Sequence, residues 1–308
     1  MPRTLQGVLP IVHVPFADDD AIDRHALERE IDWAYAQGAD GIGSGMVSET
    51  LRLTYDERIA LTQHLVQMSA GRGAVFAAVG AESAAQALAY AGAAERAGCD
   101  AVMAVPPATT RLPEPALVDY FRRLAEGVAL PVIVQDASGY VGQAIPLRVH
   151  VELLVRYGPA KILFKPEAAP IGPSLSALRD ATGGRARVFE GSGGILLVDS
   201  YRRGIAGTMP GVDLLDGIVA LWDALERRDE DTVYRVYFPI CALVALQMQA
   251  GLDGFLAIEK YLLVKRGLFT TDRRRTPHGW ELDAETAREV DRLFARLQRA
   301  LAPPEERS

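Results

Sequence analysis

The stretch KILFKPEAAP, residues 161–170, holds a short apolar run that ends in a lysine and leads at once into a Pro-Glu pair. Seven similar runs of β-branched or small apolar residues occur along the chain. None of the eight has the polar alternation of a half-exposed strand, so each is predicted to be covered on both faces, as in a parallel sheet. The runs are GVLPIV (7–12), DGIGSG (40–45), AVFAAV (74–79), AVMAV (101–105), PVIVQ (131–135), KILFK (161–165), ARVFEG (186–191) and IAGTM (205–209).

Stretches with helical periodicity separate these runs, and their apolar positions predict amphipathic helices. The strand starts fall about thirty residues apart in the first six units and closer in the last two, which is a βα period. Eight such units predict an α/β protein with the fold of a (β/α)8 TIM barrel. A doubly wound sheet is the alternative, but no GxGxxG or GxxxxGK[ST] motif follows the first run. The helical positions include Leu27, Ile31, Ala34; Leu61, Leu65, Met68; Leu117, Phe121, Leu124; and Leu147, Val151, Leu154.

The pattern changes after residue 228, where only helices are predicted, over 231–249, 255–265 and 284–301. We therefore expect a barrel over residues 1–228 and a helical extension, packed on the barrel, over 229–308. The apolar stretch PICALVALQM (239–248) is too short to span a bilayer and is expected to be a buried helix. The tail APPEERS (302–308) is expected to be disordered.

Composition and charge limit the partners that the protein can have. The formal net charge of −7 argues against a nucleic-acid partner, because phosphate binding favours a basic surface. The two cysteines are too few for a disulfide framework, and the five histidines show no metal-ligand spacing, so no metal is expected. The first ten residues lack the apolar segment of a secretory signal, so we expect a cytoplasmic protein without a membrane partner.

In a (β/α)8 barrel the active site lies at the carboxyl ends of the strands, and this rule separates the two lysines of KILFK. Lys161 opens its strand and is expected at the opposite face as a solvated or structural cation. Lys165 closes the strand and is expected to face the mouth. Apolar walls would favour its neutral amine, a nucleophile that forms a Schiff base with a ketone. The alternative for Lys165 is a salt-bridged or anion-binding lysine.

Other polar groups follow the strand ends and are further candidates. Glu167 lies two residues beyond Lys165, so both side chains share a face if the strand geometry persists, and the carboxylate could act as a base or hold the charge of the lysine. The alternative for Glu167 is an exposed loop acid. Ser192 could bind a ligand carboxylate or simply cap the next helix. The other candidates are Ser48 and Glu49 after the second run, Gln135 after the fifth, and Gly191, Gly193 and Gly194 after the seventh, with Asp136, Glu190 and Tyr140 as supporting groups.

At these residues the chain resembles the dihydrodipicolinate synthase/N-acetylneuraminate lyase superfamily. The resemblance covers most of the chain and is carried by GVLPIVHVPF (7–16), SETLRLTYDER (48–58), AVPP (104–107), ALPVIVQD (129–136) and LFKPE (163–167). It implies a (β/α)8 barrel with a C-terminal helical extension, assembled as a homo-oligomer, usually a tetramer. It also implies that Lys165 forms the Schiff base.

The chain departs from this family's usual pattern at the hydroxyl groups. Where the lyases and synthases carry a Thr-Thr-Gly-Glu loop, this chain has Met46-Val47-Ser48-Glu49, and Gln135 stands where they have a catalytic tyrosine. Pro107 or Ala108 replaces a further tyrosine. Since neither Val47 nor Gln135 can shuttle a proton, the usual condensation and retro-aldol reactions are not expected. The Ser-Glu loop, the Val-Gln-Asp-Ala strand end and the Phe-Lys-x-Glu spacing are similar to 2-keto-3-deoxy-L-arabonate dehydratase.

The resemblance implies a dehydratase acting on a small 2-keto-3-deoxy sugar acid. Lys165 would form the imine, which needs no cofactor because it is itself the electron sink, and Glu167 would remove a C3 proton. Glu49, or a water held by Gln135, is the alternative base. The substrate would be bound by Ser48, Glu49, Gly191, Ser192 and Gly193, with Met209 as an apolar wall. The alternatives are an aldolase that uses water in place of the tyrosine, and a catalytically silent barrel that binds a keto acid.

Overall fold

The computed structural model describes residues 3–303, and within them all eight predicted runs contribute a parallel strand. The strands pair in the orders β1-β8-β7 and β2-β3-β4-β5-β6. Single parallel bridges, Ile11 to Gly43 and Phe164 to Val188, join the two groups and close the barrel. The (β/α)8 prediction is confirmed. The strands are β1 (Gly7–Val8), β2 (Gly41–Gly43), β3 (Ala74–Ala78), β4 (Ala101–Ala104), β5 (Val132–Asp136), β6 (Ile162–Pro166), β7 (Phe189–Glu190) and β8 (Gly207–Thr208).

Alternate residues of the strands serve two separate cores, as expected for strands covered on both faces. Ile133 and Leu163 belong to a small cluster inside the barrel, together with Phe76 and Met103. Their neighbours in the strands pack outward in the larger cluster beneath the helices. The inward series of β6 continues from Leu163 to Lys165, so the strand period itself directs the lysine into the barrel mouth.

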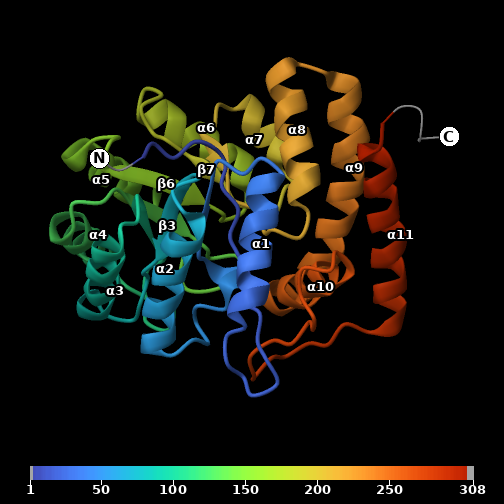
Figure 1. Cartoon of the computed structure of the whole chain (residues 1–308). Coiled ribbons are helices and arrows are strands. Elements are labelled where there is room, and N and C mark those ends of the chain that lie inside the picture. Colours follow the sequence, from blue (N-terminus) through green and yellow to red (C-terminus); the bar gives the residue numbers. More distant parts are fainter. Residues whose placement is uncertain (1–2, 304–308) are drawn as a thin grey trace.

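Eight helices surround the barrel and close the βα units (Figure 1). Most predicted faces are buried, including Leu27, Ile31 and Ala34, but on the fifth helix only Leu154 of the predicted face is fully buried. Leu147 is 40% exposed, because the side packed on the barrel carries Val149 and Leu153 instead. The helices are α1 (Arg24–Ala36), α2 (Tyr55–Ser69), α3 (Ala84–Ala97), α4 (Glu114–Gly127), α5 (Leu147–Tyr157), α6 (Ile171–Ala181), α7 (Leu197–Arg202) and α8 (Leu215–Arg227).

The C-terminal helices are α9 (Glu230–Gln247), α10 (Gly251–Lys265) and α11 (Ala284–Leu301), which agrees with the predicted ranges. The run Glu230–Lys265 is long and apolar enough to cross a membrane by length and composition alone, a test that core helices also pass. The three-residue helix η2 (Met248–Ala250) interrupts it, and α9 packs against α8, α10 and α11. Ile240, Leu243 and Val244 are buried, as expected for 239–248. The domain boundary at 228 stays a prediction, and residues 304–308 of the tail lie outside the described residues.

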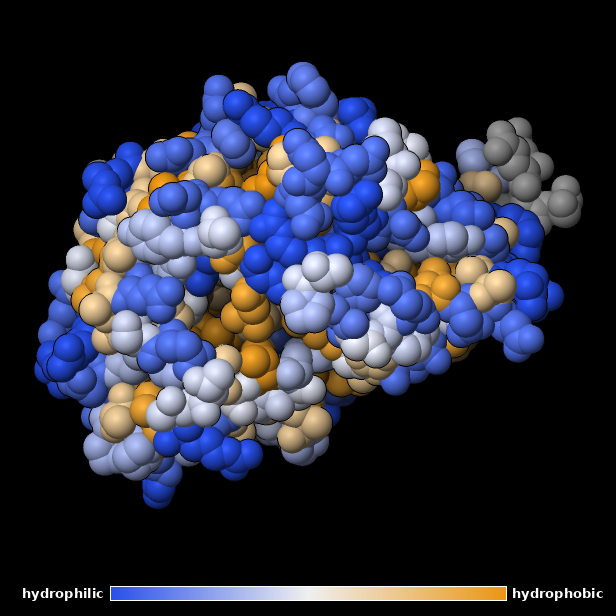
Figure 2. Space-filling model, turned by 90° about the horizontal axis from the view of Figure 1, so that it is seen from below, coloured by the Kyte–Doolittle hydropathy of each residue, from blue (hydrophilic) through white to orange (hydrophobic). Residues whose placement is uncertain are grey.

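The carboxyl ends of the strands meet at the lower end of the molecule in Figure 1, where α10 also lies. Figure 2 looks onto this face and shows a hollow with apolar side chains inside it and polar surface around it. The short helix η1 (Met46–Ser48), which follows β2, contacts α10 here. The helical extension therefore reaches the end of the barrel where a (β/α)8 enzyme has its active site.

Candidate active site

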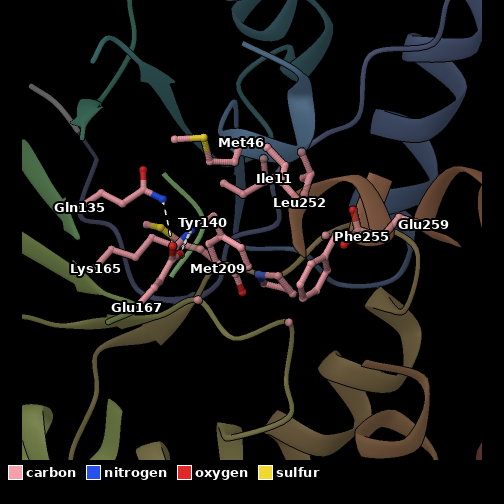
Figure 3. A pocket seen from close by; sticks show the side chains of 15 residues that line it. Ile11, Met46, Gln135, Tyr140, Lys165, Glu167, Met209, Leu252, Phe255 and Glu259 are labelled. Carbon is pink, nitrogen blue, oxygen red and sulfur yellow. Dashed lines mark hydrogen bonds and ion pairs between the residues drawn. The ribbon is translucent and has the colours of Figure 1, made fainter. Parts of the chain in front are cut away.

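Lys165 lies at the carboxyl end of β6 with its ammonium group next to a carboxylate. Its Nζ is 2.7 Å from Oε1 of Glu167, and the two residues are only 4% and 8% exposed. Gln135, which pairs with Lys165 in the β5–β6 register, donates from Nε2 to Oε2 of Glu167 at 3.3 Å. The three residues predicted to be catalytic are thus brought together (Figure 3). Because Lys165 must lose a proton before it can attack a carbonyl carbon, the Glu167 carboxylate is placed to accept that proton.

A cavity of about 460 Å³, including open space at its mouth, lies beside this pair. Strand ends, the loops after them and one helix of the extension line the cavity. The lining residues are Ile11, Met46, Val47, Gln135, Tyr140, Lys165, Glu167, Gly191, Gly193, Met209, Pro210, Gly211, Leu252, Phe255 and Glu259.

Gly191 leaves room for the Lys165–Glu167 pair. A Cβ atom at this position would lie 2.4 Å from Cε of Lys165 and 2.1 Å from Oε1 of Glu167. The glycine therefore lets the β7–α7 loop pass this close to the pair without displacing the ends of these two side chains. Gly193, in the same loop, has φ of +70° and also lines the cavity. Both glycines and Met209 lie where the sequence predicted them.

Ser48 and Ser192 were both predicted to bind substrate, but in the described part of the chain neither residue lines the cavity. Oγ of Ser48 donates to the carbonyl oxygen of Val12 and accepts from the backbone N–H of Gly45. Oγ of Ser192 accepts from the backbone N–H of Leu196 at 3.0 Å, just before α7. Each hydroxyl serves a loop hydrogen bond, so the capping alternative describes Ser192 better than carboxylate binding does.

Glu49 was also predicted to bind substrate or act as a base, but its carboxylate is buried elsewhere. It forms an ion pair with Nζ of Lys260 and accepts from the backbone N–H of Arg275 at 2.9 Å. Lys260 in turn donates to the carbonyl oxygens of Val14 and Arg273. Glu49 therefore fixes the loop after β2 to α10 and to the segment that follows α10, and the structure does not place it at the cavity.

Tyr140 was predicted only as a supporting group, and the structure places it in the cavity wall. Asp136 accepts from the backbone N–H groups of Ser138 and Ile145, which shapes the loop that carries Tyr140. Burial, and then the carboxylates of Glu167, Glu259 and Glu190, raise the pKa of Tyr140. The phenol therefore keeps its proton at neutral pH and can donate a hydrogen bond into the cavity.

The contribution of α10 was not predicted. Leu252, Phe255 and Glu259 lie on one face of the helix and line the cavity, and the Phe255 ring packs edge-on against Tyr140 at 5.6 Å. The spacing of these three residues, i, i+3 and i+7, is the signal that could have found them, because a carboxylate interrupts an otherwise apolar helix face.

Glu259 belongs to a buried charged group with His13, Glu30 and Asp213. Nε2 of His13 lies 2.8 Å from Oε2 of Glu259, and Nδ1 lies 2.9 Å from Oε1 of Glu30. In the described part of the chain, His13, Asp213 and Glu259 bring possible metal-ligand atoms within 4.8 Å of one another. A cation bound there would have to replace a hydrogen bond that His13 already makes.

The His13 environment predicts a pH-dependent stability. Burial opposes protonation of His13, but the hydrogen bonds to Glu259 and Glu30 outweigh it and raise the pKa from 6.5 to about 10. A histidine with a raised folded-state pKa stabilises the protein fully below its unfolded pKa, and this stability is lost as the pH rises towards the folded pKa. The loss is at most about 1.4 kcal/mol per pH unit.

We therefore expect the melting temperature to fall between about pH 7.5 and about pH 9.5. This window lies above the Asp213 pKa of about 7, so that the titration of Asp213 contributes little to the change. Thermal melts of His13→Asn should show a smaller fall, while the exposed His25→Asn control should follow the unmodified protein. Equal pH dependence in all three proteins would contradict this assignment.

Comparison with known proteins agrees with the fold. The model of the dihydrodipicolinate synthetase family matches residues 4–158. The chain is 28% identical over 298 residues to L-2-keto-3-deoxyarabonate dehydratase of Azospirillum brasilense, with 95% of this chain and 94% of that protein covered. It is 32% identical to 4-hydroxy-tetrahydrodipicolinate synthase of Thiobacillus denitrificans, but over only 61% of this chain and 58% of that protein.

A crystal structure of dihydrodipicolinate synthase from Rhodopseudomonas palustris superposes with a TM-score of 0.86 at 25% identity. The match covers 95% of this chain and 98% of that one, so the barrel and its helical extension are both shared. With the family model matching half of the chain and the same architecture in a solved relative, this chain belongs to the dihydrodipicolinate synthetase family.

Proposed function

We propose that the protein is a Schiff-base-forming dehydratase that acts on a short 2-keto-3-deoxy sugar acid. The observation that carries the proposal is the buried Lys165 Nζ, 2.7 Å from a carboxylate that can take its proton and beside a cavity at the carboxyl ends of the strands. The match to the Azospirillum dehydratase along almost the whole chain supports this substrate class. Gln135, in place of a tyrosine at the end of β5, supports elimination over aldol cleavage.

The proposed reaction begins when the neutral Lys165 amine attacks the C2 ketone and water leaves to give a cationic imine. This cation acidifies the C3 hydrogens, and Glu167 removes one of them to form the enamine. The enamine electrons then expel the C4 hydroxyl, which leaves as water with the proton that Glu167 took from C3. Hydrolysis of the unsaturated imine frees Lys165. A proton shift in the remaining allylic alcohol gives a dioxo acid with all carbon atoms retained.

The substrate carboxylate is proposed to bind the backbone of the loop that carries Gly191 and Gly193. Both residues line the cavity beside Lys165, and glycines allow close approach of a ligand to the backbone. Met209 and Phe255 supply apolar contacts for the carbon chain. No metal or organic cofactor takes part in these steps, because the protonated imine supplies the electron sink.

Replacing Glu167 by Gln should separate imine formation from elimination. The amide cannot accept the C3 proton, so we expect dehydration to fall by about 10²–10⁴. The amide also cannot take the Lys165 proton, so borohydride should fix pyruvate to Lys165 more slowly, but the adduct should still form on long incubation, and the loss in dehydration should be the larger of the two. The measurement is the dehydration rate beside the yield of the reduced adduct. A variant that keeps the full rate would remove Glu167 as the base.

An aldolase is the second candidate, and the position of Tyr140 in the cavity wall favours it. Retro-aldol cleavage needs a base or a proton relay at the C4 hydroxyl, and a phenol can serve as that relay. A panel of 2-keto-3-deoxy acids analysed by product mass distinguishes the candidates. A dioxo acid without carbon loss supports the dehydratase, and pyruvate plus an aldehyde supports the aldolase. An inert protein that binds keto acids without trapping them would be a silent homologue.

The proposal includes a role in sugar-acid breakdown in the cytoplasm and the homotetramer that the family resemblance implies. The two cysteines are unpaired in the structure, which suits a reducing compartment. Sedimentation velocity of the full chain tests the assembly, and a mass other than four chains would remove the tetramer from the proposal.

A further inference from the structure

Glu259 is a carboxylate in the cavity wall that the proposed reaction does not use. It comes from α10, and Figure 3 shows it across the cavity from Lys165 and Glu167, beyond the Phe255 ring. Its side chain is 3% exposed. A buried carboxylate is costly unless other groups compensate its charge, so its presence in a largely apolar wall requires an explanation.

His13 compensates and orients this carboxylate. The imidazole lies between Oε2 of Glu259 and Oε1 of Glu30, at 2.8 Å and 2.9 Å, and all three residues are buried. A protonated imidazole donates one hydrogen bond to each carboxylate, which fixes the Glu259 rotamer. Glu259 is thus held in place by groups that do not themselves line the cavity.

The second oxygen of Glu259 remains available to a ligand. Among residues 3–303, no side chain or backbone group donates to Oε1 of Glu259. Gly211 forms the nearby wall. A Cβ atom at this position would lie 2.9 Å from Oε1 of Glu259 and 2.7 Å from Oδ1 of Asp213. The glycine therefore leaves open a region beside Oε1 of Glu259, which can accept a hydrogen bond and repel an anion.

We infer that Glu259 is a specificity-determining residue that accepts a hydrogen bond from a hydroxyl group at the far end of the substrate. The inference rests on the proposed function, since it requires the keto group to be fixed at Lys165. It names the substrate class more narrowly: 2-keto acids with a hydroxylated tail are selected, and those with a second carboxylate or a phosphate at the far end are rejected. Rejection follows from placing a second anion beside Glu259 in a site of low dielectric.

The test measures how fast borohydride fixes each of three acids to Lys165, counting the adducts of substrate and of product together. The three acids have the same number of carbon atoms. These are 2-keto-3-deoxypentonate, 2-oxopentanoate, which lacks the tail hydroxyls, and 2-oxoglutarate, which ends in a carboxylate. We expect the second-order trapping rate to be about 10- to 100-fold higher for the deoxypentonate than for 2-oxopentanoate, and lowest for 2-oxoglutarate. In Glu259→Gln the preference for the deoxypentonate should fall about tenfold and trapping of 2-oxoglutarate should rise about tenfold.

Pyruvate has no tail, so its trapping rate is the reference to which the rates of the three acids are normalised in each protein, and it should be equal in the unmodified protein and in the exposed control Glu28→Gln. Measurable pyruvate trapping in Glu259→Gln also shows that this variant is folded. Unchanged ratios among the three acids in Glu259→Gln would overturn the inference while leaving the Lys165 chemistry intact. If Glu259→Gln does not fold, the trapping rates of the unmodified protein still test the inference. Trapping of 2-oxoglutarate as fast as of the deoxypentonate would overturn it. Failure of pyruvate trapping in the unmodified protein would instead overturn the proposed function.

Discussion

Replacing Lys165 by Ala should abolish product formation, with a fall of at least about 10⁴ in the rate on any 2-keto-3-deoxy acid that the protein converts. The methyl group cannot form an imine, and without an imine the C3 hydrogens are not acidic enough for Glu167 to remove. The variant should still fold, because truncating Lys165 removes a charge whose partner, Glu167, retains the hydrogen bond from Gln135. The rate is measured by product mass, with folding checked by circular dichroism.

Lys161 provides the matched control for this experiment, because it lies at the start of the same strand, at the opposite end of the barrel. Its ammonium group donates to the carbonyl oxygens of Val128 and Leu130. Lys161→Ala should lose some stability and keep its catalytic rate at temperatures where it is folded. Full activity in Lys165→Ala, or equal losses in both folded variants, would contradict the proposed mechanism.

Replacing Glu49 by Ala should produce the largest loss of stability, about 3–5 kcal/mol in the free energy of unfolding. The substitution leaves Lys260 buried without its carboxylate partner, and burial already lowers the pKa of this lysine. It also removes the acceptor for the backbone N–H of Arg275. Urea unfolding followed by circular dichroism measures the loss.

An exposed ion pair supplies the comparison. Glu289 pairs with Arg292 on the surface of α11, where Glu289→Ala should change the free energy of unfolding by less than about 1 kcal/mol. If Glu49→Ala is as stable as Glu289→Ala but no longer converts substrate, then Glu49 acts at the site, as first predicted, and not as an internal anchor.

The sequence was sufficient to predict the barrel because the strands of a parallel sheet are recognised locally. Each run is short, apolar and followed by a helix, and its last residue marks the active end of the barrel. The same rule placed Lys165, Gln135 and Glu167 together, since a strand period of two fixes which residues point inward.

The rest of the site could not be predicted because it depends on contacts between distant parts of the chain. Glu49 and Lys260 are 211 residues apart, and nothing near Glu49 indicates that its partner is on α10. His13 and Glu259 are 246 residues apart. A strand pattern also does not show that a helix of the extension will form one wall of the cavity, so Phe255 and Glu259 emerged only from the fold.

The central claim is that one buried amine, that of Lys165, attacks a ketone. The most direct test is to treat the full chain with pyruvate and sodium borohydride, digest it and locate the modification by mass spectrometry. We predict a single modified peptide, with Lys165 heavier by the mass of one pyruvic acid less one oxygen atom. An unmodified Lys165, or an adduct on another lysine, would contradict the claim.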